Sequence, residues 1–199
     1  MPDIYTHDIS GCFAEVIGDR GASTGSMAMM LDAAEGPWAL LRSALVEDDF
    51  PPLTLVQQTD DLAKIKTAAA HLSQHCDVVA IIGVGGSSLG ARALTALASR
   101  PSVELRFLDN PDPDSLARFA DSVDLARTGA VVVSKSGGTA ETIAMAMTVI
   151  PMIAAARESD AMADFVVAIA EPIDNPLRRL VAHWDITVID HDPEIGGRY

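Results

Sequence analysis

Five short apolar runs alternate with helical segments between residues 77 and 189, and this alternation constrains the fold more than any other feature. The first run, DVVAIIG at 77–83, is too short for a helix and rich in β-branched residues, which is typical of a strand buried on both faces of a parallel sheet. We therefore predict an α/β fold, a doubly wound five-stranded parallel sheet with helices on both faces. The expected strands are 77–83, 103–108, 130–133, 165–170 and 186–189. Two helices are expected at 89–99 and 140–157, and two more are expected to begin at Asp112-Pro113 and at Asn175-Pro176.

The first 58 residues lack this alternation, and we expect them to form an N-terminal arm with a helical appendage, followed by a second domain over residues 59–199. Glycines and weak periodicity predict loose structure at the start of the arm. The apolar residues of the helical segment are interpreted as an ordinary core face, with an exposed patch as the alternative. The expected segments are an arm at 1–26, a helix at 27–46 with a break at Gly36-Pro37, a linker at 48–53 and an amphipathic helix at 60–75.

Composition excludes several classes of function. The chain has 28 acidic and 14 basic residues among 199, a formal net charge of −14, which argues against nucleic-acid and anionic-membrane partners. A small anion is still possible, because a few local donors can hold it. Since we find neither an early apolar stretch like a signal peptide nor an apolar run near 18 residues, we expect a cytoplasmic protein.

The two cysteines, Cys12 and Cys76, indicate neither a disulfide framework nor a thiolate metal cluster. His71 and His75 stand four residues apart on a predicted helix, directly before Cys76, and such spacing can bind zinc. No carboxylate follows nearby to complete a ligand set. We interpret these histidines as polar residues at a solvated helix end, and we expect no metal.

Two glycine- and serine-rich loops follow the first and third predicted strands. The first is GVGGSSLG at 83–90, and the second is SKSGGT at 134–139. Glycines let the backbone approach a ligand closely, and the helix that follows each loop presents free N–H groups. The second loop adds three hydroxyls and a lysine, which are the donors and the charge that a phosphate dianion needs. Together the loops predict a phosphate site beyond the carboxyl ends of the strands.

A dinucleotide site is the main alternative for the first loop. Gly83 and Gly85 begin the dinucleotide fingerprint, but Ser88 stands where the third glycine belongs, although Asp109 ends the second strand as a ribose-binding acid would. The second loop is not a nucleotide P-loop either, because Lys135 precedes its glycines rather than following them.

The chain resembles the phosphoglucose isomerase family in four stretches that occur in the family's order. GVGGSSLGA at 83–91 resembles Gly-Ile-Gly-Gly-Ser-x-Leu-Gly-Pro, and SKSGGTAET at 134–142 resembles Ser-Lys-Thr-x-Thr-Thr-x-Glu-Thr. LDNPDP at 108–113 resembles the family's exit from the second strand, and IGGRY at 195–199 resembles Gly-Gly-Arg-x-Ser. The resemblance covers about residues 75–199 and implies a sugar isomerase (SIS) domain, a flavodoxin-like sandwich.

The resemblance also assigns roles to single residues. It places Gly86 and Ser87 against the sugar, where they help to close the pocket, and it implies no cofactor. The residues that it implies hold the 6-phosphate are Ser134, Lys135, Ser136 and Thr139. Gly137 and Gly138 replace bulkier residues of the family, which predicts a looser loop. Glu141 is interpreted as a first-turn acid that complements the dipole of its helix.

Arg198 is the catalytic residue that the resemblance implies. The family interconverts glucose 6-phosphate and fructose 6-phosphate through an enediolate, and a guanidinium beside the reacting carbons stabilises the charge that develops there. The alternative is that Arg198 is only part of a disordered chain end. The family's glutamate base, ring-opening histidine and C-terminal lysine lie downstream of Tyr199, and His191 and Glu194 match no family motif. We therefore expect chain 1–199 to bind a sugar phosphate without turning it over.

Three interpretations of this partial match are open. We favour one domain of a longer isomerase that works as a homodimer; a shortened gene or a free-standing SIS module that senses sugar phosphates are the alternatives. The Gly-Gly-Arg ending distinguishes an isomerase from a sensor, since a sensor has no need of an arginine that stabilises an enediolate. Fusion to a transaldolase is a further possibility.

Overall fold

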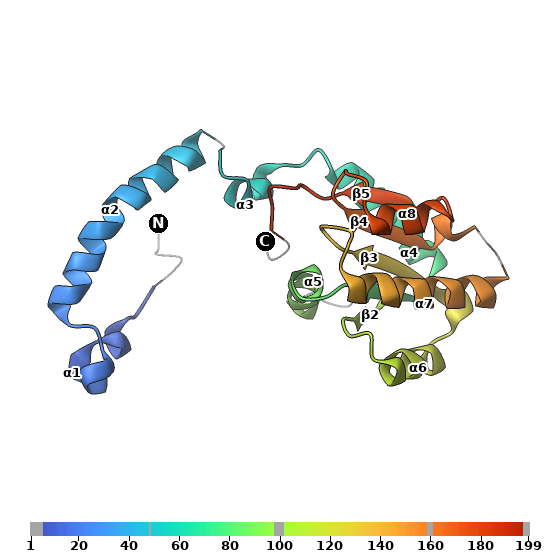
Figure 1. Ribbon diagram of the computed structural model, residues 1–199, viewed down its shortest axis with the longest axis horizontal. Coiled ribbons are helices and arrows are strands. Elements are labelled where there is room, and N and C mark those ends of the chain that lie inside the picture. Colours follow the sequence, from blue (N-terminus) through green and yellow to red (C-terminus); the bar gives the residue numbers. More distant parts are fainter. Residues whose placement is uncertain (1–5, 48, 98–101, 159–160, 197–199) are drawn as a thin grey trace. The chain divides into compact units, whose positions relative to one another are not determined.

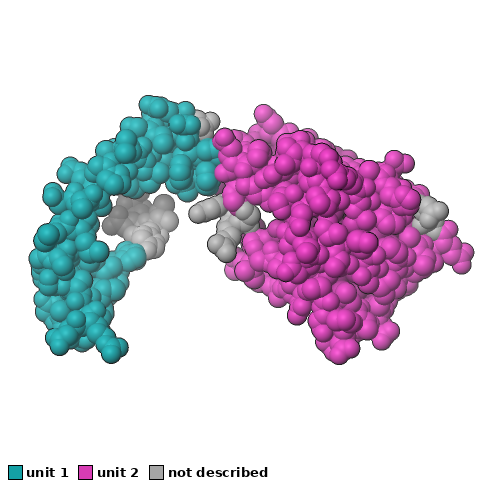
Figure 2. All heavy atoms as spheres, viewed as in Figure 1, with its two compact units in different colours: residues 1–54 teal, residues 55–199 magenta. Residues whose placement is uncertain are grey.

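The computed structural model describes residues 6–47, 49–97, 102–158 and 161–196, which form two compact units, 1–54 and 55–199 (Figure 2). Unit 1 consists of one long helix and several short ones, and unit 2 contains the sheet with its own helices (Figure 1). The elements of unit 1 are η1 Ser10–Cys12, α1 Ala14–Ile17, η2 Gly18–Arg20, α2 Thr24–Val46 and α3 Pro51–Thr54. Those of unit 2 are η3 Leu55–Gln57, α4 Leu62–His75, β1 Val78–Ile82, α5 Gly86–Leu97, β2 Glu104–Leu108, α6 Pro113–Ser122, η4 Leu125–Arg127, β3 Thr128–Val133, α7 Ala140–Arg157, η5 Met162–Asp164, β4 Val166–Ala170, α8 Pro176–Ala182 and β5 Thr187–Asp190.

The sheet of unit 2 confirms the predicted fold class. All five strands are parallel, in the order β2-β1-β3-β4-β5. Alternate residues of the strands face opposite layers, as Ala80 and Ile82 contribute to one hydrophobic cluster and Val79 to another. Helices α6, α7 and α8 cover the first layer, and α4 covers the second (Figure 1). The α/β sandwich therefore has helices on both faces.

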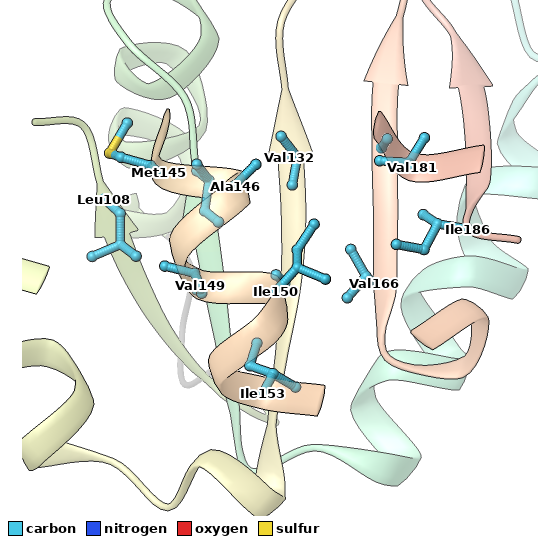
Figure 3. Packing of buried hydrophobic residues seen from close by; sticks show 14 of the residues in the cluster. Leu108, Val132, Met145, Ala146, Val149, Ile150, Ile153, Val166, Val181 and Ile186 are labelled. Atoms are coloured by element: carbon cyan, nitrogen blue, oxygen red, sulfur yellow. The ribbon is translucent and has the colours of Figure 1, made fainter. Parts of the chain in front are cut away.

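Helix α7 forms the centre of the core. Its Met145, Val149, Ile150 and Ile153 are fully buried and extend into the layer shared with β3 and β4 (Figure 3). Within the described part of the chain, α7 is also the one helix with the length and composition to cross a membrane. A third of this helix is buried in the protein, and core helices of soluble proteins meet the same criteria of length and composition.

The helix boundaries follow local capping chemistry where the sequence supplies it. Asp112 and Asn175 cap α6 and α8 as predicted, since their carboxylate and amide oxygens accept hydrogen bonds from the N–H groups of Ser115 (2.8 Å) and Arg178 (2.9 Å). Proline follows each cap at the first helical position, where its missing N–H is no loss.

The predicted break at Gly36-Pro37 is wrong, because α2 continues through Pro37 to Val46. Pro37 removes one helical hydrogen bond, but strong helix formers such as alanine, leucine and methionine on both sides outweigh it. The core-face interpretation of this segment is also wrong, because no residue of α2 is buried and Met29 and Leu40 are about three-quarters exposed.

Two other expectations about the N-terminal part need correction. The arm is not merely loose, because η1, α1 and η2 form successive helical turns and Phe13 pairs with Ala22 in a β-bridge. The segment expected to be a linker, 48–53, contains the start of the helical turn α3, which begins at Pro51. The φ angle of proline suits the first position of a helix.

Gly137 holds the loop after β3 against α8. Its φ of +63° lies in the left-handed region, and a Cβ atom there would be 2.0 Å from the Asn175 side-chain oxygen. The Gly137 N–H donates to the Ser134 carbonyl (2.9 Å), and its own carbonyl accepts from the Leu177 N–H (2.8 Å). Glycine at 137 therefore tightens this loop, contrary to the looser loop expected from the sequence.

The substitution Gly137→Ala should lower the free energy of unfolding by about 2–3 kcal/mol, because alanine is strained at positive φ and its methyl displaces the cap of α8. Gly138→Ala is the matched control, since Gly138 has no positive φ and its nearest atoms are 3.9 Å from a Cβ. Urea denaturation measures both. Equal effects of the two substitutions would contradict a specific requirement for glycine at 137.

Candidate functional site

The two glycine-rich loops meet at the carboxyl edge of the sheet, because β1 and β3 are neighbours. Ile82 pairs with Val132 near the ends of these strands. A Cβ atom on Gly83 would lie 3.0 Å from the Val133 carbonyl oxygen and 3.1 Å from the Ser87 side chain. Glycine therefore lets the first loop cross directly over the end of β3. The chain order reverses at this point of the sheet, which is where open α/β sheets form a ligand crevice.

The first loop is shorter than expected, since α5 begins at Gly86 rather than near residue 89. Gly85 supplies the turn with a φ of +62°, and its carbonyl accepts from the N–H groups of Ser88 (3.0 Å) and Leu89 (2.9 Å). Gly86 and Ser87 thus stand in the first helical turn, both partly buried. Ser88 is fully buried, and its hydroxyl has no hydrogen-bond partner among the described residues.

The second loop gathers three hydroxyl groups before α7. Ser134 is buried, its N–H donates to the Ile169 carbonyl (3.0 Å), and its hydroxyl donates to the Thr139 hydroxyl (3.2 Å). Ser136 is exposed, and its hydroxyl accepts from the Gly138 N–H (3.3 Å). The structure therefore brings Ser134 and Thr139 into direct contact and leaves Ser136 facing solvent.

The first turn of α7 lacks the self-capping found in α6 and α8. Its N-cap is Thr139, whose side chain accepts no hydrogen bond from the helix, whereas Asp112 and Asn175 both do so for their helices. Glu141 lies in this turn and is exposed, as expected of an acid that complements the helix dipole. The N–H groups at the start of α7 can therefore serve an anion from outside the helix.

The Lys135 side chain contacts the neighbouring loops. Its ammonium group donates to the Pro193 carbonyl (2.6 Å) and lies 3.6 Å from a carboxylate oxygen of Glu171. The Glu171 N–H in turn donates to the Lys135 carbonyl at 2.9 Å. Lys135 thus contacts the loops that follow β4 and β5.

Sequence reasoning missed Glu171 and Arg178. The Arg178 guanidinium donates to the carbonyls of Ala170 (3.1 Å) and Glu171 (2.7 Å) and pairs with Asp190. Glu171 follows β4 directly, so inspecting the residue after every strand, as the ligand-crevice rule suggests, would have found it. These two side chains anchor the loop after β4 at the edge where the predicted site lies.

The last predicted residue, Arg198, lies outside the described residues. The segment leading to it is described as far as Gly196, and Ile195 within it is buried. His191 contacts the Asp192 carbonyl through its Nδ1 (2.7 Å), and the Glu194 N–H donates to the Asp192 carboxylate (2.8 Å). Both are therefore engaged in local loop contacts.

The dinucleotide alternative finds no support in the structure. Asp109, the candidate ribose-binding acid, pairs with Arg92 of α5 at 2.8 Å. Ser88 stands in place of the third glycine and is fully buried within α5. The Asp109 carboxylate that would bind a ribose hydroxyl is thus already paired with Arg92.

Within the described residues, the histidine pair on α4 is not placed together with a third metal ligand. The rings of His71 and His75 lie 4.5 Å apart, and His71 is 3.5 Å from a carboxylate oxygen of Asp164. Burial raises the pKa of the Cys76 thiol, which opposes the thiolate that a metal would require. Over the described ranges, no group of three His, Cys, Asp or Glu residues is placed to hold a metal.

A hollow of about 550 Å³ lies on the α4 side of unit 2, away from both loops. Its lining is largely apolar and comes from α4, β4, β5 and the η5 region, and it includes none of the predicted site residues.

Comparison with known proteins identifies the region that contains both loops. The family model described as phosphoglucose isomerase matches residues 62–199. A glucose-6-phosphate isomerase of Thermus thermophilus is 33% identical over 119 residues, which are 60% of this chain and 28% of the relative. A probable glucose-6-phosphate isomerase of Haloarcula marismortui is 35% identical over 154 residues, 77% of this chain and 34% of the relative.

Two solved structures have folds similar to that of this chain. A hypothetical protein from Thermus thermophilus superposes with a TM-score of 0.62 at 24% identity, over 81% of this chain and 42% of that protein. A glucose-6-phosphate isomerase from Chlamydia trachomatis superposes with a TM-score of 0.52 at 27% identity, over 71% of this chain and 29% of that enzyme. The chain spans about a third of the length of the curated relatives that it matches. On the match over residues 62–199, the chain belongs to the phosphoglucose isomerase family.

Proposed function

We propose that this chain is the sugar-phosphate-binding part of a glucose-6-phosphate isomerase. The observation that carries the proposal is the meeting of two hydroxyl- and glycine-rich loops at the β1/β3 edge, inside the region that matches the family. In this proposal the full-length protein is a cytoplasmic homodimer that interconverts glucose 6-phosphate and fructose 6-phosphate.

The phosphate group binds at the loop after β3 in this proposal. The hydroxyls of Ser134, Ser136 and Thr139 donate to its oxygens, together with the first N–H groups of α7, and Lys135 supplies positive charge to the loop. The Ser134 hydroxyl can be redirected from Thr139 to the ligand by a rotation about one bond. Hydrogen bonds to a charged group are worth about 1.5–3 kcal/mol each, so the three hydroxyls contribute substantially to holding a dianion on an acidic protein.

The sugar lies across the loop after β1, where Gly86 allows close approach and Ser87 donates a hydrogen bond. The reaction moves a proton from C2 to C1 of the open-chain sugar through an enediolate, and negative charge develops on its oxygens. Arg198 stabilises that charge in the transition state more than in the bound substrate, and this difference is what lowers the barrier. The base that carries the proton belongs to the part of the family's length that this chain does not span.

The phosphate-loop assignment predicts the effect of removing single hydroxyls. Ser134→Ala and Thr139→Ala should each weaken binding of 6-phosphogluconate by about 10-fold or more, because each removes a donor to a charged oxygen. Isothermal titration calorimetry on chain 1–199 measures this. Thr148→Ala is the control, since the Thr148 hydroxyl donates to the Ala144 carbonyl further along the same helix (2.9 Å).

Unchanged affinity in both site variants would contradict the assignment of the loop. If 6-phosphogluconate bound equally well after Ser134→Ala and Thr139→Ala, the phosphate would have to lie elsewhere on the domain.

Turnover by chain 1–199 should be absent or very slow, because a placed proton-transfer base contributes about 10² to 10⁴ in rate and the family's base lies downstream. An assay that couples glucose 6-phosphate formation to a dehydrogenase measures the rate. Interconversion of fructose 6-phosphate at the rate of a full-length relative assayed in parallel would contradict this expectation.

A further inference from the structure

Lys135 is the basic residue of the loop after β3, yet its ammonium group is committed to protein partners. It donates to the Pro193 carbonyl at 2.6 Å and lies 3.6 Å from the Glu171 carboxylate. The side chains of Lys135 and Glu171 are 29% and 16% exposed, so water screens their attraction less than it would at an open surface. The position of the ammonium group is therefore well determined by protein contacts.

These contacts connect three loops at the carboxyl edge. Lys135 belongs to the loop after β3, Glu171 follows β4, and Pro193 lies in the segment after β5. A backbone hydrogen bond from the Glu171 N–H to the Lys135 carbonyl joins the first two loops (2.9 Å). Only the Lys135 side chain, among the contacts described for this loop, extends the connection to the segment after β5.

The segment after β5 carries the Gly-Gly-Arg motif. Pro193 precedes Arg198 by five residues. We propose that Lys135 is a positioning residue that braces residues 193–196 against the phosphate loop, and that Glu171 holds it there. The effect of this contact on ligand binding rests on the proposed function. The restraint of residues 193–196 by Lys135, called the brace below, can be tested without ligand.

A direct contact between the Lys135 ammonium and the phosphate is less favourable than this arrangement. Moving the ammonium toward a phosphate would weaken its contacts with the Pro193 carbonyl and the Glu171 carboxylate, and a carboxylate left without its partner in a largely shielded place is costly. An unpaired carboxylate would also repel the incoming dianion. With Lys135 in place, the Glu171 charge is neutralised and the hydroxyls and N–H groups of the loop remain as donors.

Hydrogen–deuterium exchange on chain 1–199 without ligand tests the brace. In Lys135→Met and in Glu171→Gln, deuterium uptake over residues 191–196 should become about 5-fold faster or more, because the segment loses a contact that restrains its opening. Lys135→Arg should restore the slow uptake, since a guanidinium can donate to the Pro193 carbonyl and pair with Glu171. The double variant should exchange no faster than Lys135→Met alone, because both changes remove one connection.

Lys64→Met is the matched control. Lys64 of α4 also donates through its ammonium to a backbone carbonyl of the β5 region, that of Val188 at 3.2 Å, but contacts neither loop. Its removal should leave uptake over 191–196 unchanged. If Lys135→Met and Glu171→Gln also left that uptake unchanged, there would be no brace and the proposal would be overturned.

Binding experiments separate a positioning role from direct phosphate contact. Inorganic phosphate probes the loop alone, and 6-phosphogluconate also probes the sugar side. The double variant Lys135→Met with Glu171→Gln leaves no unpaired carboxylate beside the loop, so it should change the affinity for inorganic phosphate by less than about 3-fold but weaken 6-phosphogluconate by about 10-fold, because the displaced segment leads to Arg198, which faces the sugar in the proposed function. Glu171→Gln should weaken 6-phosphogluconate as well. Tighter binding in Glu171→Gln, with loss of inorganic phosphate binding in the double variant, would make Lys135 a phosphate ligand and overturn the proposal.

Failure of the proposed function gives a different result. If the unaltered chain bound neither inorganic phosphate nor 6-phosphogluconate, the assignment of the loop would fail, while the exchange experiment would still decide whether Lys135 braces the segment.

Discussion

The parallel pairing of β1 with β3 is the contact on which the candidate site depends. It places Ile82 beside Val132, so the loops that follow the two strands begin side by side. Because Gly83 has no side chain, the first loop can pass close over the end of β3. A Cβ atom at this position would lie only 3.0 Å from the Val133 carbonyl oxygen. The helices α5 and α7 then both start at the same edge, with their N–H groups directed away from the strands. Each later feature of the site follows from this adjacency.

The chain has a net charge of −14, yet the site proposed here accepts an anion. Local donors resolve this apparent conflict, because hydrogen bonds of short range act on a bound phosphate while distant surface carboxylates are screened by salt. Glu171, an acid beside the loop, is paired with Lys135, and Glu141 lies exposed on the first turn of α7. Neutralising a shielded carboxylate is as important for such a site as supplying a cation to the ligand.

Much of unit 2 could be predicted from the sequence because its signals are local. Apolar runs of β-branched residues marked the strands, and Asp112-Pro113 and Asn175-Pro176 marked helix starts through side-chain caps that form as expected. Errors arose where tertiary contacts or neighbouring residues outweighed a local signal. Helix α5 begins at Gly86 although glycine disfavours helices, and α2 continues through Pro37.

The contacts of the site were harder to predict than its position. The rule that ligands bind beyond the carboxyl ends of strands identified both loops, but the partners of Lys135 come from segments 36 and 58 residues away in the chain. Likewise, only the position of Asn175 beside Gly137 explains why glycine is needed there. Side-chain direction depends on such packing, which a single sequence does not contain.

The central claim is that the loops after β1 and β3 form one anion site. The most direct measurement is a titration of ¹⁵N-labelled chain 1–199 with 6-phosphogluconate, followed by amide NMR. The account predicts that the amide signals of residues 85–88 and 136–142 shift together and fit a single dissociation constant. Shifts confined to the α4 side, around His71 and Asp164, or shifts in one loop without the other, would contradict it.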